Sequence, residues 1–75
     1  MDQIGEGRIE LTPREREVIA LIADGMSAKG IAREMNLSHR TVERHIETSR
    51  CKLRAHNKSE LVAKALADGL IGPPH

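Results

Sequence analysis

The most regular pattern along the chain lies between residues 37 and 53. Within it, one narrow and weakly apolar stripe recurs at helical spacing, formed by Val42, Ile46, Ser49 and Leu53. Almost all other positions in this stretch are polar, and many are basic. The pattern predicts a helix that is anchored along one edge and presents a wide charged face to a molecule outside the protein.

Capping residues give the bounds of this helix and of the one before it. Ser38 is a suitable N-cap, so we expect the helix to span about residues 39–54. A shorter helix begins just after Ser27, which is also a suitable N-cap. Residues 36–38 form a tight turn between the two, and a short helix, a turn and a longer basic helix are typical of a helix-turn-helix.

Two further helices are indicated nearer the ends of the chain. The first has Thr12 as N-cap, Pro13 at its first position and Glu15 where a capping-box glutamate belongs. Gly25 is its expected stop. Its predicted apolar side consists of Val18, Leu21 and Ile22.

The fourth helix is expected after the N-cap Asn57, which has the acidic residue Glu60 three positions on. It continues to about Asp68 and stops at Gly69, after which residues 70–71 fold back as a hydrophobic clasp. Its apolar residues are Leu61, Val62, Ala65 and Leu66.

No segment has a strand pattern, so the predicted fold class is all-α, a compact four-helix helix-turn-helix domain. We expect this domain to occupy residues 11–71, after a flexible N-terminal segment at 1–10 and before a disordered tail at 72–75. Since the 75 residues include no Phe, Tyr or Trp, the core must be aliphatic. The absence of aromatic rings also argues against binding of single strands by base stacking.

Composition excludes several other classes of protein. The single cysteine, Cys51, permits neither an internal disulfide nor a cysteine-based zinc site. No apolar run approaches the ~20 residues that span a membrane, and the polar start of the chain does not resemble a signal peptide, so we expect a cytoplasmic protein. No phosphate loop, nucleophile motif or paired acids appear, and we predict no enzyme, metal, cofactor or small-molecule ligand.

The small net charge of +1 conceals an uneven distribution. Residues 1–25 carry three basic and six acidic side chains, a net charge of −3. Residues 26–60 carry eight basic and four acidic side chains, a net charge of +4. The positive charge therefore gathers around the helix-turn-helix, where a partner such as duplex DNA would bind.

The residues that would read DNA follow from helical geometry. At roughly 100° per residue, the positions opposite the apolar stripe are Arg40, Arg44, Glu47 and Cys51, flanked by Glu43 and Thr48. The N-terminal half of this face should enter the major groove. Arg44 is the first candidate for a contact with guanine O6 and N7, and Arg40 could do the same or bind phosphate.

The two glutamates on this face allow two interpretations. The carboxylates of Glu43 and Glu47 could accept a hydrogen bond from cytosine N4 and so read sequence. Alternatively, they form ion pairs with Arg40, Arg44 or Arg50 at helical spacing. For Glu47 we favour the ion pair.

Contacts to phosphate need donors near the rim of the groove. Helix N-termini offer free backbone N–H groups, and each capping serine or threonine could act both as a cap and as a contact. The candidates are Thr12, Arg14, Ser27, Lys29, Ser38, Thr41 and Lys52.

Matches in all four predicted helices add a family resemblance. They are residues 11–18, 31–32, 41–42, 45, 52–53, 57, 60–62 and 69–71. In these positions the chain resembles the LuxR-type, GerE-like helix-turn-helix domain of bacterial transcription regulators. The resemblance implies a dimer on duplex DNA, with the fourth helix as the dimer contact. Departures from the family pattern are Gly30, where an acidic residue is usual, and Ser49, where isoleucine or alanine is common.

We therefore expect a sequence-specific, dimeric transcription regulator with the helix at 39–54 in the major groove. Its homodimer contact would come from the exposed members of the set Leu61, Val62, Ala65 and Leu66. One alternative is a protein–protein module that heterodimerises with a related regulator and inhibits it. A second alternative is a domain similar to region 4 of sigma factors.

Overall fold

The computed structural model describes residues 10–72. Residues 1–9 of the predicted flexible segment and residues 73–75 of the predicted tail lie outside the described residues. Four α-helices and no strands are present in the described part, which confirms the predicted fold class. The helices are α1 (Pro13–Ala23), α2 (Ala28–Met35), α3 (His39–Lys52) and α4 (Lys58–Ala67).

Each helix begins at the residue that the sequence predicts. The N-caps are Thr12, Ser27, Ser38 and Asn57, and each side chain accepts a hydrogen bond from the backbone N–H three residues on. At α1 the capping box is complete, since the Thr12 N–H also donates to the Glu15 carboxylate at 2.8 Å. The local sequence therefore fixes all four helix starts.

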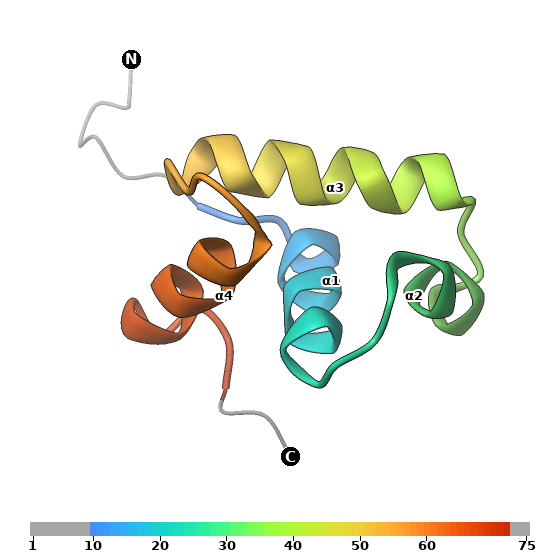
Figure 1. Ribbon diagram of the computed structural model, residues 1–75, viewed down its shortest axis with the longest axis horizontal. Coiled ribbons are helices and arrows are strands. Elements are labelled where there is room, and N and C mark those ends of the chain that lie inside the picture. The colour runs from blue at the N-terminus through green and yellow to red at the C-terminus, as the bar shows by residue number, and fades with distance from the viewer. Residues whose placement is uncertain (1–9, 73–75) are drawn as a thin grey trace.

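Helices α1 and α3 hold the domain together, because each contacts the other three helices. In Figure 1, α3 lies along one edge of the molecule, with α1 beneath its middle and with α4 and α2 beneath its two ends. None of the helices in residues 10–72 is long and apolar enough to cross a membrane. Within residues 10–72, the other three helices all lie on one side of α3, and its outer side faces away from them (Figure 1).

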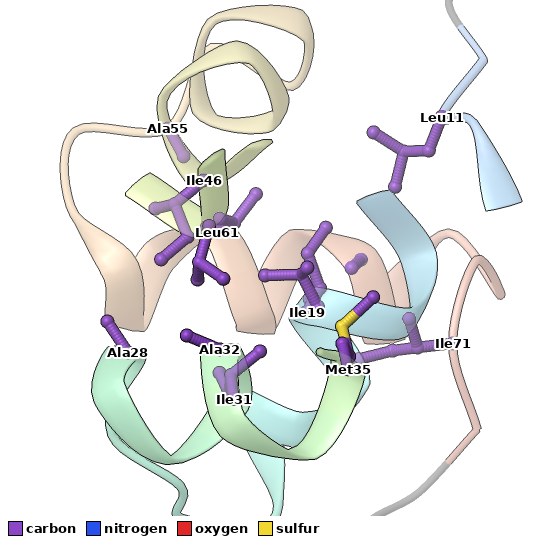
Figure 2. Close-up of a cluster of buried hydrophobic side chains, with 13 residues drawn as sticks. Leu11, Ile19, Ala28, Ile31, Ala32, Met35, Ile46, Ala55, Leu61 and Ile71 are labelled. Atoms are coloured by element: carbon purple, nitrogen blue, oxygen red, sulfur yellow. The ribbon is translucent and has the colours of Figure 1, made fainter. Parts of the chain in front are cut away.

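The core is aliphatic, as predicted, and every helix contributes to it. Its fully buried side chains include Ile19, Ile31, Val42 and Leu61 from the four helices in turn, and Figure 2 shows part of this cluster. Ile71 also packs into the core from beyond α4, in agreement with the predicted hydrophobic clasp. Because Val42 and Ile46 of α3 are part of this core, the core fixes which side of α3 faces outward.

The predicted apolar side of α1 needs correction. Val18 is fully buried as expected, but so is Ile19, whereas Leu21 and Ile22 are half-buried. The reason is that α1 packs against all three other helices, so the side of α1 that is buried depends on how those helices are arranged around it. Glu15 also lies on the buried side, and its residue is only 4% exposed.

The predicted end of α3 also needs correction, because the helix stops at Lys52 instead of residue 54. Arg54 adopts a left-handed conformation with φ of 55°. Two cations bind the carbonyls that this turn leaves without helical partners. Arg50 Nη1 donates to the Ala55 carbonyl at 2.9 Å, and Lys64 Nζ donates to the Arg54 carbonyl at 2.8 Å.

Candidate nucleic-acid interface

The outward face of α3 has the composition that its sequence predicts. Val42, Ile46 and Ser49 are buried against the other helices. The six side chains predicted for the opposite face are all exposed, namely Arg40, Glu43, Arg44, Glu47, Thr48 and Cys51. The structure thus brings the candidate base-reading residues onto one continuous surface.

Ser49 is a polar residue in the buried stripe, and it is fully buried. Its Oγ donates a hydrogen bond of 2.7 Å to the His45 carbonyl in the preceding turn. This bond satisfies the hydroxyl, so the serine at this position does not leave an unpaired polar group beneath α3.

The two glutamates on the outward face have different partners. Glu47 receives a double hydrogen bond from Arg50, with Nε to Oε1 at 3.2 Å and Nη2 to Oε2 at 2.6 Å. The Arg50 guanidinium lowers the pKa of the Glu47 carboxyl, and the carboxylate raises the pKa of Arg50. The ion pair favoured for Glu47 is therefore present.

Glu43 forms a weaker ion pair one turn closer to the start of the helix. Its Oε2 lies 3.3 Å from His39 Nε2, and both side chains are about half exposed, at 51% and 53%. The pair carries full charge only when the histidine is protonated. The predicted arginine partners are not the ones that Glu43 contacts.

The hydroxyl groups proposed for phosphate contacts serve as helix caps. Ser27 Oγ accepts from Gly30 N–H at 3.1 Å, and Ser38 Oγ accepts from Thr41 N–H at 3.0 Å. Ser38 Oγ also donates to Thr41 Oγ1 at 2.8 Å. Thr12, Ser27 and Ser38 remain exposed, as do Arg14 and Lys29, so each is accessible to a partner. Their contact with phosphate stays a prediction.

Lys52, also predicted to bind phosphate, is engaged within the protein. Its Nζ lies 2.8 Å from Glu15 Oε1 and 3.2 Å from the Glu10 carbonyl oxygen. Burial raises the pKa of the Glu15 carboxyl, but hydrogen bonds from Lys52 and Thr12 lower it to below its ordinary value of 4.5. Lys52 therefore ties the end of α3 to the start of α1, and its contact with phosphate stays a prediction.

Replacing Lys52 with methionine is expected to lower the free energy of unfolding by about 1–3 kcal/mol near neutral pH. Because the folded-state pKa of Glu15 is depressed, its contribution is complete above pH 4.5 and is lost as the pH falls through that folded-state pKa. The stabilities of wild type and variant should therefore converge in acid. Urea unfolding followed by circular dichroism, once at neutral pH and once in acid, measures the difference in the free energy of unfolding between the two proteins.

The exposed Lys58 provides the matched control, since Lys58→Met removes the same charge without breaking a buried pair. We expect its effect to be within about 0.5 kcal/mol. An equal loss for Lys52→Met at neutral and acid pH would show that the pair with Glu15 is not the cause.

Three contacts of basic side chains near the end of α3 and the start of α4 escaped the sequence analysis. Arg50 and Lys64 close the C-terminal turn of α3, and His56 Nδ1 pairs with Glu60 Oε1 at 2.8 Å. The hydrogen bonds from His56 lower the pKa of the Glu60 carboxyl. The spacing of four residues between His56 and Glu60 could have indicated their pair. The other two contacts have no such signal, because they depend on the turn after α3, which Lys64 reaches from ten residues away.

The predicted dimer residues divide into two groups. Leu61 and Ala65 are fully buried in the core of the domain itself, so they have no surface left for a partner. Val62 and Leu66 are half-buried. Val62 also lines a groove of about 340 Å³ together with Ile22, Ala23, Lys58 and Ser59.

Comparison with known proteins supports the sequence resemblance. Residues 10–65 match the family of bacterial regulatory proteins described as the luxR family, represented by GerE. The transcriptional activator protein SolR of Ralstonia solanacearum is 41% identical over 68 residues, which cover 91% of this chain and 29% of SolR. The chain spans less than a third of the length of SolR and of two other curated relatives that it matches.

Solved structures agree with the fold. The transcription factor GerE superposes with a TM-score of 0.80 at 32% identity, covering 83% of this chain and 92% of GerE. A VqmA–ligand–DNA complex from Vibrio cholerae gives a TM-score of 0.75 at 39% identity, covering 83% of this chain and 27% of VqmA. The family match over residues 10–65 includes all of α2 and α3.

Proposed function

The chain belongs to the luxR family of bacterial regulatory proteins, and from this membership we propose that it binds duplex DNA sequence-specifically as a dimer. In this proposal α3 enters the major groove, and the bound protein regulates transcription from that site. Such a role places the protein in the cytoplasm, where bacterial DNA lies. VqmA, a relative of known structure, has been solved in complex with DNA.

The single observation that carries the proposal is the outward face of α3. Arg40 and Arg44 lie exposed in its N-terminal half, and among residues 10–72 neither guanidinium has a hydrogen-bond or ion-pair partner. Arginine in such a position can bind guanine O6 and N7 together. The side chains are therefore available for bases without the loss of any internal contact.

Backbone donors would hold the protein on the phosphates at either side of the groove. The N-termini of α1, α2 and α3 carry exposed caps at Thr12, Ser27 and Ser38, with Arg14 and Lys29 close by. A helix N-terminus combines free N–H groups with the positive end of the helix dipole. These contacts orient the domain but do not read sequence.

A labelled pool of random duplexes tests the proposal. We expect retention of duplexes at low salt. The logarithm of the binding constant should fall linearly with the logarithm of the salt concentration, with a slope of about −0.9 per phosphate contact. Failure to retain any duplex at low salt would contradict the proposal. Capture of a full-length luxR-family regulator in that case would favour the heterodimer module instead.

The dimer contact is proposed at Val62 and Leu66 of α4, beside Ile22 of α1. Changing Val62 to glutamate places a charge in this apolar patch, and we expect the variant to bind a palindromic site at least ~10-fold more weakly. Light scattering on the complex with duplex should show one protomer per duplex for Val62→Glu and two for wild type. Ala67→Glu at an exposed position of the same helix is the control, and an equal loss in both variants would argue against this interface.

A further inference from the structure

Two glutamates lie on the exposed face of α3, and exposure alone does not distinguish them. The side chains of Glu43 and Glu47 are 51% and 62% exposed. A carboxylate in this position repels the phosphates of DNA, and either a neutralising partner or a hydrogen bond from a base would offset this repulsion. Their partners separate the two cases.

Glu47 is committed to a contact within the protein. Arg50 holds both of its carboxylate oxygens, and the same guanidinium donates through Nη1 to the Ala55 carbonyl at 2.9 Å. Turning Glu47 toward a base would break two charge-assisted hydrogen bonds and release the group that closes the end of α3. Glu47 therefore acts as a positioning residue for Arg50.

Glu43 is free to move by comparison. In the part of the chain that the structure describes, its one ion pair is the contact of 3.3 Å with the half-exposed imidazole of His39. An exposed pair of this kind contributes little to stability, so the carboxylate can leave it at small cost. Glu43 is also the fifth residue of α3, within the half of the helix where side chains reach bases.

The chemistry of a carboxylate then selects the base. An ionised glutamate only accepts hydrogen bonds, and the donors in the major groove are cytosine N4 and adenine N6. Adenine places the acceptor N7 beside its amino group, which repels a carboxylate, whereas cytosine presents its amino group without that acceptor. We infer that Glu43 reads a cytosine in the target site and that Glu47 reads no base. This inference rests on the proposed function.

Two matched variants of the full 75-residue chain test this assignment. Glu43→Gln and Glu47→Gln each remove one negative charge and retain the shape of the side chain. Each protein selects duplexes from the same random pool, and circular dichroism verifies that each is folded. Any effect of net charge on general affinity for DNA should be the same in both variants.

We expect wild type to select a motif that contains a cytosine at one position. Glu43→Gln should change the preference at that position from cytosine to adenine by roughly 10-fold or more, because glutamine binds adenine N6 and N7 together. Glu47→Gln should select the wild-type motif.

An unchanged motif in Glu43→Gln overturns the inference, and so does a changed motif in Glu47→Gln. Recovery of no motif by wild type is a separate result, visible without either variant. It contradicts the proposed function on which the inference rests.

Discussion

Replacing Ile19 with alanine is expected to lower the free energy of unfolding by about 2–5 kcal/mol. Ile19 is fully buried at the centre of α1, the helix that contacts all three others. Domains of this size have total stabilities of only about 5–15 kcal/mol, so the loss is a large fraction of the whole. Urea and thermal unfolding followed by circular dichroism at 222 nm (the helical band) measure it.

Ile22→Ala is the matched control, because it removes the same atoms from a half-buried position of the same helix. Its cost should be smaller by at least ~1 kcal/mol, since less apolar area returns to water and no enclosed cavity forms. Equal destabilisation by the two variants would contradict the full burial of Ile19 in the core.

Replacing Arg44 with alanine is expected to remove discrimination at one base pair of the selected site, at a cost of about 1–3 kcal/mol. The Arg44 side chain is exposed on the N-terminal half of α3, so the domain itself should remain folded. Fluorescence anisotropy with the selected duplex, and with duplexes altered at each position in turn, measures the loss.

Arg16→Ala removes the same charge from a different surface. Arg16 lines a groove of about 630 Å³ between α1 and the C-terminal segment, next to Leu70 and Ile71. We expect this variant to keep the wild-type order of preference among the altered duplexes. Loss of the same preference in both variants would mean that Arg44 contributes only positive charge.

The sequence predicts those parts of the fold and of the candidate site that depend on near neighbours along the chain. The four N-caps, the exposed face of α3 and the Glu47–Arg50 pair all follow from spacings of three or four residues. Helical periodicity also identifies Val42, Ile46 and Ser49 as the buried edge of α3. These features are local, so they need no knowledge of how the helices pack.

Contacts between distant segments were not predictable in the same way. The contact between Lys52 and Glu15 joins residues that are 37 positions apart in the sequence, so no local pattern indicates it. The end of α3 was placed two residues too late because an arginine, Arg54, takes the left-handed position where glycine is the usual signal. The burial of Ile19 was not predicted, because only the packing of the helices shows which side of α1 faces the other three.

The central claim is that α3 reads bases in the major groove, and replacing guanine by 7-deazaguanine in the selected duplex tests it most directly. This change removes only N7, an acceptor that lies in the major groove. At the guanine read by Arg44, wild type should bind the modified duplex about 5-fold to 100-fold more weakly, whereas Arg44→Ala should bind both duplexes equally. Equal binding of both duplexes by wild type, at every guanine of the site, would contradict the claim.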